Sequence, residues 1–211
     1  MTNSDGLIRG FTWVLGLVVG LTISLAAAGA PNLVANPGFE DNCEFFSTDF
    51  GGHIGPPQWD LLPAPYAALL AAWGPPDTHS GTCAAAFGAF GGGDDTIYQM
   101  IPTTPGLDYS VSFWAELDTS LPGNTRLTPY HLAVNFAGDM VLDTDSLLTT
   151  SFSQFSRTIE ATGTTSWLSI SARNNPAFVI VDDVSVVVPE PGSLALLGLG
   201  LAGFAFSRRK R

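Results

Sequence analysis

Short runs of alternating apolar and polar residues dominate the sequence between residues 32 and 188. In "DYSVSFWAEL" the side chains of Tyr109, Val111, Phe113 and Ala115 fall on one face of an extended strand, and the residues between them fall on the other. Gly, Pro, Asn or Asp bounds these runs, and no stretch keeps a sustained helical period. The pattern predicts an all-β fold whose core is formed by the alternate apolar residues.

The spacing of the runs is typical of an antiparallel β-sandwich with about eight strands. We expect strands over residues 32–39, 83–90, 96–102, 108–117, 151–161, 166–172 and 177–188, and a hairpin over 129–143 that turns at Gly138 and Asp139. The proline-rich stretch 49–76 is expected to be a long, partly ordered loop, with two helical turns over residues 66–73 as an alternative for that segment.

Uninterrupted apolar runs occur at both ends of the chain. The first covers residues 11–28, follows a segment containing Arg9, and ends in the small residues that signal peptidase requires. It predicts a helical secretory signal peptide, residues 1–28, cleaved after Ala28; an uncleaved membrane anchor is the alternative. Residues 29–188 then form the predicted sandwich domain.

The charge of the predicted domain is strongly negative. Residues 29–188 contain seventeen Asp and Glu but only three Arg and no Lys. Such a surface repels phosphate backbones, which excludes nucleic acid as a partner. Divalent cations and neutral, hydroxyl-rich partners remain compatible with it.

The chain has two cysteines, Cys43 and Cys83. In an exported protein the simplest interpretation is one disulfide, and closing this loop is expected to stabilise the fold by about 4 kcal/mol. A metal site with His53 and His79 is the alternative, although structural zinc sites usually have two close pairs of ligands.

Three segments of the domain resemble one known family. The sequences "NLVANPGFE" at residues 32–40, "IYQMIPTTPGLDYSVSFWA" at 97–115 and "ARNNPAFVIVDDVSVV" at 172–187 are similar to strands of galactose-binding-like jelly rolls of the carbohydrate-binding-module type. The resemblance covers nearly the whole domain. It implies a jelly-roll β-sandwich.

The C-terminal segment 189–211 resembles the PEP-CTERM sorting signal of exported proteins in Gram-negative bacteria that make extracellular polysaccharide. The resemblance rests on Pro189, Glu190 and Pro191, on the apolar run after them, and on the basic end Arg208, Arg209, Lys210 and Arg211. It implies that an exosortase cleaves near the Pro-Glu-Pro and removes the tail.

The apolar run of the tail is short for a permanent anchor. As a helix, residues 192–207 span about 24 Å, less than the roughly 30 Å of a bilayer's hydrocarbon core. The basic end favours the cytoplasmic side of the inner membrane and leaves the acidic domain outside. We expect a transient transmembrane helix in the inner membrane, followed by release to the cell surface or extracellular matrix; a permanent anchor is the alternative.

No catalytic motif is present in the sequence: it has no Gly-x-Ser-x-Gly elbow, phosphate-binding glycine loop or His-Glu-x-x-His. Glu40 and Asp183 are predicted to approach each other because, in similar jelly rolls, the first and last strands lie close together. They are a candidate structural calcium site, the one cofactor we expect. The alternative is that one of the adjacent aspartates Asp182 and Asp183 points to solvent while the other caps a turn or accepts backbone hydrogen bonds.

Candidate ligand-binding residues lie on the polar faces of the expected strands. Trp114, Trp167, His131 and Asn135 would form a sugar-binding surface if their strands were neighbours in one sheet, because sugar rings stack on indole faces while polar groups bind their hydroxyls. The alternative is that the long loop covers the tryptophans and completes a second small core.

Together these features predict an exported, non-catalytic protein of the cell surface or matrix that binds extracellular polysaccharide. Its expected processing partners are signal peptidase and exosortase. A structural or adhesive matrix protein without a specific glycan ligand is the first alternative, and a glycoside hydrolase is the second.

Overall fold

The computed structural model describes residues 30–41, 43, 46–48, 56–62, 69–89, 93–118, 130–174 and 176–189. In this part of the chain all regular secondary structure is β-strand, which confirms the all-β prediction. None of these residues belongs to a helix of the length and hydropathy needed to cross a membrane. The predicted signal helix and the predicted helix of the tail lie outside the described residues.

The strands form two sheets. They are β1 (Phe46–Thr48), β2 (Asp60–Leu62), β3 (Leu69–Trp73), β4 (Ala84–Phe87), β5 (Asp95–Pro102), β6 (Asp108–Leu117), β7 (His131–Phe136), β8 (Asp139–Thr144), β9 (Ser153–Glu160), β10 (Thr165–Arg173) and β11 (Val179–Val187). One sheet has the order β1-β3-β4-β11-β6-β9 and the other β2-β5-β10-β7-β8. Every pairing is antiparallel.

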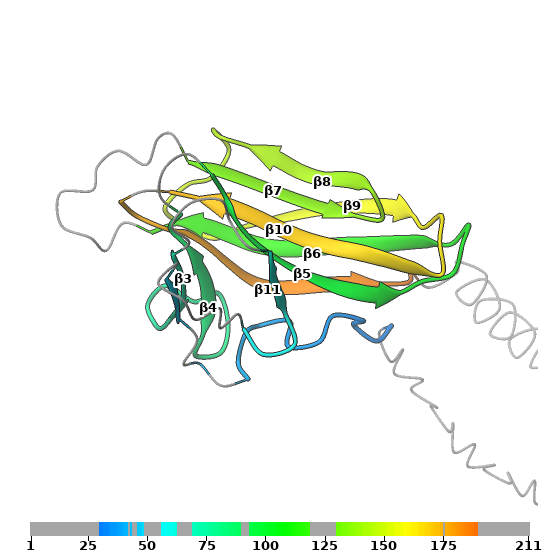
Figure 1. The fold of residues 1–211 in the computed structure, drawn as a ribbon, viewed down its shortest axis with the longest axis horizontal. Coiled ribbons are helices and arrows are strands. Elements are labelled where there is room, and N and C mark those ends of the chain that lie inside the picture. Colours follow the sequence, from blue (N-terminus) through cyan, green and yellow to red (C-terminus); the bar gives the residue numbers. More distant parts are fainter. Residues whose placement is uncertain are drawn as a thin grey trace, which may run out of the picture.

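The last eight strands have the topology of a jelly roll. Strands β4 to β11 contribute the order β4-β11-β6-β9 to one sheet and β5-β10-β7-β8 to the other, so most connections cross between the sheets (Figure 1). The short strands β1, β2 and β3 extend the two sheets at one edge. The predicted β-sandwich of about eight strands is therefore confirmed, with these additions.

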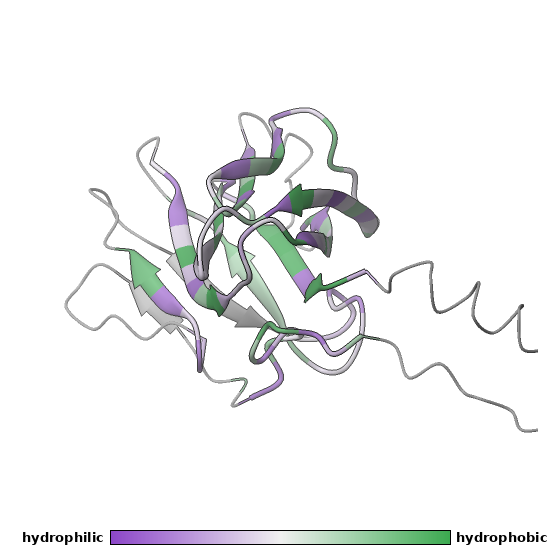
Figure 2. Ribbon diagram, turned by 90° about the vertical axis from the view of Figure 1, so that its right-hand side faces the viewer, coloured by the Kyte–Doolittle hydropathy of each residue, from purple (hydrophilic) through white to green (hydrophobic). Residues whose placement is uncertain are grey.

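The core lies between the sheets and follows the alternation of the sequence. In β6 the predicted core residues Tyr109, Val111, Phe113 and Ala115 are all buried, while the residues between them face outward. The other sheet contributes buried side chains from β5, β7 and β10. Figure 2 shows the resulting bands of hydrophobic and hydrophilic residues along the strands.

The predicted first strand at residues 32–39 is wrong. This segment forms turns, because Asn36 and Phe39 have φ angles of 48° and 59°, which are incompatible with extended pairing. Side-chain amides hold it instead of a strand ladder. Gln99 exchanges two hydrogen bonds with the backbone of Ala35, and Asn32 donates to the Val184 carbonyl and accepts from the Val186 N–H.

The expectation for residues 49–76 is also corrected. The described parts of this stretch contain β2 and β3, and residues 69–73 are a strand rather than part of the two helical turns that were the alternative. β3 pairs with β4 from Leu70 to Trp73. The hydropathy of a short apolar run does not distinguish a strand from a buried helix. The pairing of residues 70–73 with β4 makes this segment a strand.

A bulge in β11 explains how a buried strand carries two adjacent aspartates. The pairing of β11 with β6 shifts register between Asp182 and Ser185, and Asp183 has a φ of 49°. The bulge directs both carboxylates toward residues 79–80 on the outer side of the six-stranded sheet.

The conformation of the turn between β7 and β8 can be tested by substitution. Phe136 pairs with Asp139, and the two central residues, Ala137 and Gly138, have φ angles of 54° and 91°. Because such a turn favours Asn at its first central position, Ala137→Asn should raise the free energy of unfolding in urea by about 0.5–1 kcal/mol. The matched control, Ala133→Asn on extended backbone of β7, should give no increase. Equal effects of the two changes would contradict the assignment.

Candidate functional site

The outward face of the five-stranded sheet collects most of the predicted ligand-binding residues. We call it the Trp167 face, and its central residues are Thr96, Tyr98 and Met100 of β5, Trp167, Ser169 and Ser171 of β10, and His131, Ala133 and Asn135 of β7. The register places Tyr98 opposite Ser169, and Ser169 opposite Asn135, in one row across three strands. His131, Asn135 and Trp167 therefore share a sheet face, because β7 and β10 are neighbours, as the sequence analysis required.

An aromatic stack stands at one end of this face. The rings of Tyr98 and Trp167 lie 4.4 Å apart between centroids, with an angle of 22° between their planes. Trp167 nevertheless remains 47% exposed, and so does its cross-strand neighbour Met100. Tyr98 covers one side of the indole, so the opposite side and the edges remain open to a ligand.

A shallow pocket adjoins the indole. It has a volume of about 340 Å³ and lies between the β7–β8 turn and the segment that leads from β9 into β10. Its lining consists of Ala137, Gly138, Thr162, Gly163, Thr165, Ser166 and Trp167. Trp167 thus belongs both to the aromatic stack and to the wall of this pocket.

Uncommitted polar groups lie beside the stack. Thr96 and Ser171 hydrogen-bond to each other through their hydroxyls at 2.8 Å. Within the part of the chain that the structure describes, the side chains of Ser169 and Asn135 make no hydrogen bond to protein groups. One hydroxyl and one amide are therefore available to bind ligand hydroxyls.

His131 is held by two carboxylates at the other end of the Trp167 face. Its Nδ1 lies 2.7 Å from Asp94 Oδ2 and its Nε2 lies 2.9 Å from Asp143 Oδ1. Arg173 Nη1 also donates to Asp94. Because an ionised carboxylate only accepts hydrogen bonds, both contacts are satisfied together when the ring carries both protons.

The structure separates Trp114 from the other predicted residues. Trp114 lies on β6, in the six-stranded sheet, so it cannot share a surface with Trp167. The ring of His79 stacks on it at 3.8 Å and 14°, and Phe152 contacts His79 edge-on at 5.5 Å. Trp114 is therefore covered by His79 from the segment before β4, and not by the loop 49–76 that the sequence alternative named.

Loop 79–83, on this opposite side of the sandwich, is bound by three carboxylates. Asp182 Oδ2 accepts the N–H groups of His79 and Ser80, at 2.9 and 3.1 Å. Asp183 accepts the Ser80 hydroxyl at 2.8 Å and lies 2.6 Å from His79 Nδ1. Burial raises the pKa of Asp182 to about 6, against the effect of its backbone hydrogen bonds.

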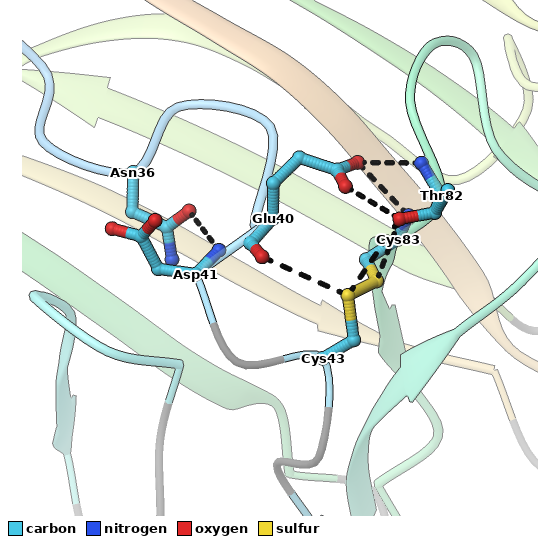
Figure 3. Close-up of a disulfide and its surroundings, with 6 residues drawn as sticks. All are labelled: Asn36, Glu40, Asp41, Cys43, Thr82 and Cys83. Carbon is cyan, nitrogen blue, oxygen red and sulfur yellow. Dashed lines mark hydrogen bonds between the residues drawn. A yellow bond between two sulfur atoms is a disulfide. The ribbon is translucent and has the colours of Figure 1, made fainter.

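Glu40 and the disulfide hold the end of the same loop (Figure 3). Glu40 Oε1 accepts the N–H groups of Thr82 and Cys83, and Oε2 accepts the Thr82 hydroxyl at 2.7 Å. Burial would raise the pKa of Glu40, but these hydrogen bonds outweigh it and lower the pKa below 4.5. Gly81 is required here, because a Cβ at this position would lie 2.1 Å from Glu40 Oε1.

The predicted disulfide joins Cys43 to Cys83, with their Cα atoms 5.9 Å apart. With both sulfurs bonded to each other, neither is available for the alternative zinc site; His53 lies outside the described residues.

The four carboxylate oxygens of Glu40 and Asp183 already face loop 79–83. These oxygens already accept hydrogen bonds from the loop, and calcium would require six to eight oxygen ligands at the same place. Calcium binding at Glu40 and Asp183 stays a prediction.

The sequence alone did not indicate the stacking of Tyr98 or the burial of Glu116. Tyr98 alternates with the core residues Ile97 and Gln99, so its outward position could be inferred, but its stacking on Trp167 depends on the pairing of β5 with β10. Glu116 faces outward from β6 yet is only 7% exposed. Its burial comes from segments distant in sequence, which no local pattern indicates.

The C-terminal residues belong to a known class of signal. Residues 187–210 match the family described as the PEP-CTERM protein-sorting motif. The chain carries a PEP-CTERM sorting signal. The match includes the Pro-Glu-Pro and all but the last of the four terminal cations, and such a motif implies export of the protein that carries it.

No curated protein matches this chain. Similar solved structures include the enzymatically active domain of bacteriophage CBA120 tailspike protein 4, at 12% identity and a TM-score of 0.49 over 74% of this chain and 21% of that one. The CBM22-1 xylan-binding domain of Paenibacillus barcinonensis Xyn10C has 12% identity and a TM-score of 0.48, over 79% and 99% of the two chains. TmCBM61, solved in complex with beta-1,4-galactotriose, has 16% sequence identity and a TM-score of 0.45, over 75% of this chain and 99% of that one. These likenesses are too low to transfer a ligand or an activity to this chain.

The buried carboxyl of Glu116 predicts how stability depends on pH. Burial, followed by the nearby charges of Asp77 and Asp118, raises the pKa of Glu116 from 4.5 to about 7. The folded state therefore binds more protons than the unfolded state between these two values, and the free energy of unfolding should fall as the pH rises through this window.

Glu116→Gln should remove roughly 3 kcal/mol of this decline, because the amide keeps the shape of the side chain without the charge. Urea denaturation between about pH 4.5 and 8 measures it. A smaller slope should remain, owing to Asp182 with its pKa of about 6. Glu160→Gln, at an exposed end of β9, is the control and should leave the slope unchanged; an unchanged slope in Glu116→Gln would refute the assignment.

Proposed function

We propose that this chain is an exported, non-catalytic protein of the cell surface or extracellular matrix that binds polysaccharide through the Trp167 face. The observation that carries the proposal is the exposed Trp167 indole, stacked on Tyr98 and bordering a pocket, with Ser169 and Asn135 beside it. Sugar rings bind to such surfaces through their C–H faces while neighbouring polar groups take their hydroxyls.

The distribution of carboxylates supports a non-catalytic role. Glycosidases place two carboxyl groups on opposite sides of an accessible bond. Among the carboxyls of the described residues, that of Glu116 has its pKa raised to about 7, and it is buried on the sheet opposite to the pocket. On the Trp167 face, Asp94 and Asp143 are both engaged by His131.

The proposed processing divides the chain into three parts. Residues 1–28 are removed by signal peptidase, residues 29–188 form the sandwich domain, and residues 189–211 are the tail removed by exosortase. The PEP-CTERM match at residues 187–210 supports the last step. The inner membrane is a transient partner in this scheme, before the domain reaches the cell surface or matrix.

The role of the indole is tested by substitution. Trp167→Ala should weaken binding to polysaccharide by about 10- to 100-fold in affinity electrophoresis, because most of the stacking surface is lost. Trp114→Ala is the matched control and should leave affinity unchanged, since His79 covers that ring. Equal losses in both variants would contradict the assignment of the face. Absence of wild-type binding to any glycan would favour a structural or adhesive role, and turnover of the polysaccharide would favour a hydrolase.

The role of the tail is tested by mass spectrometry of the mature protein. Co-expressed with an exosortase, the chain should be recovered without the residues that follow the Pro-Glu-Pro. Glu190→Ala should retain Arg211, while the control Ser193→Ala should be processed normally. Recovery of Arg211 in the mature wild-type protein would refute processing.

A further inference from the structure

The charges around the Trp167 face indicate which class of glycan it takes. Among the described residues of the five-stranded sheet, the basic side chains are His131 and Arg173. Asp94 binds both of them, and Asp143 binds His131 as well. Neither side chain is therefore available to a uronate or sulfate group of a ligand without breaking an existing contact with a carboxylate.

A carboxylate that lacks this compensation lies beside the aromatic stack. Asp60 of β2 is exposed and stands directly opposite Tyr98 in the register. Its side chain has no hydrogen bond or ion pair with the residues that the structure describes. Since Leu61 packs on the core, Asp60 points to the same side of the sheet as Tyr98.

Carboxylates thus lie on both edges of the face, Asp60 on β2 and Asp143 on β8. The two strands are four strand spacings apart, or roughly 19 Å, so an extended oligosaccharide crossing the sheet passes both. The domain as a whole carries seventeen acidic residues against three arginines. Its field attracts cations and repels anions before contact.

We propose that the ligand of the Trp167 face is an amine-bearing glycan, a polymer of amino sugars with free ammonium groups. The inference rests on the proposed polysaccharide binding and names its ligand class. One ammonium group pairs with Asp60, and others lie near the open side of the indole, where the ring quadrupole attracts a cation. The sugar ring itself stacks on Trp167, and Ser169 and Asn135 bind its hydroxyls. An acidic glycan meets Asp60 without a compensating cation.

The test uses two oligosaccharides with the same backbone, glucosamine hexamers and their fully N-acetylated counterparts. Binding to the mature domain is measured by calorimetry at about pH 5.5, where the amines of the oligomer are protonated. The amine-bearing oligomer should bind at least about fivefold more tightly, as expected for one exposed ion pair near an aromatic ring. Raising NaCl from about 0.05 to 0.5 M should abolish the difference.

Asp60→Asn locates the charge. It should weaken binding of the glucosamine oligomer by about fivefold and leave the acetylated oligomer unaffected. Glu160→Gln, an equally exposed carboxylate on the edge of the other sheet, is the control and should change neither affinity. Because Asp60 is exposed on a short edge strand, the variant is expected to fold, and the salt dependence of the wild-type protein provides a measurement independent of it.

The outcomes distinguish this inference from the function beneath it. Equal binding of the two oligomers, with both lost in Trp167→Ala, would overturn the amine preference and keep the polysaccharide-binding function. Tighter binding of polygalacturonate than of glucosamine hexamers would also overturn the preference alone. No binding to any of these ligands would overturn the amine preference, whereas the polysaccharide-binding function is overturned only if no glycan binds the wild-type protein.

Discussion

The alternation of apolar and polar residues along β5, β6, β7 and β10 is the constraint on which the rest of the structure depends. Two sheets can pack only if each strand sends every second side chain into the space between them. Once Val111 and Phe113 are committed to the core from one side and Leu168 and Ile170 from the other, their neighbours must face outward. Trp167 and Asn135 are surface residues for this reason, and a slip of one residue in either strand would bury them.

The same alternation explains which parts of the fold and of the candidate site could be predicted from the sequence. The sequence predicted a shared surface for Trp167, His131 and Asn135 only on the condition that their strands were neighbours, which long-range pairing decides. The outward faces of β6, β7 and β10 follow from period-two patterns within single strands. The position of Trp114 does not, because its own pattern is the same whichever sheet receives β6. Sheet membership is a property of long-range pairing. The predicted strand at residues 32–39 is wrong for a different reason. Side-chain amides of Asn32 and Gln99 replace the backbone hydrogen bonds of a strand there. The positive φ angles of Asn36 and Phe39 cannot be inferred from hydropathy.

The two outer sides of the sandwich use their acidic residues in different ways. On the six-stranded side, Glu40, Asp182 and Asp183 direct their oxygens at backbone and side-chain donors of loop 79–83, where the disulfide also ends. These carboxylates organise the protein itself. On the five-stranded side, Asp94 binds His131 and Arg173, Asp143 binds His131, and Asp60 faces solvent beside Tyr98. Net charge alone would not reveal this division of roles.

A hydrogen bond from the Leu33 N–H to the Val186 carbonyl joins the beginning of the domain to its end. Val187 pairs with Ser110 at the start of β6, and β6 follows directly on the end of β5, where Met100 faces Trp167. Entry, exit and the aromatic stack therefore occupy one pole of the sandwich, and the His131 cluster occupies the other. A domain tethered through its C-terminus would therefore be held at the same pole as the aromatic stack, because Val187 is its last paired residue.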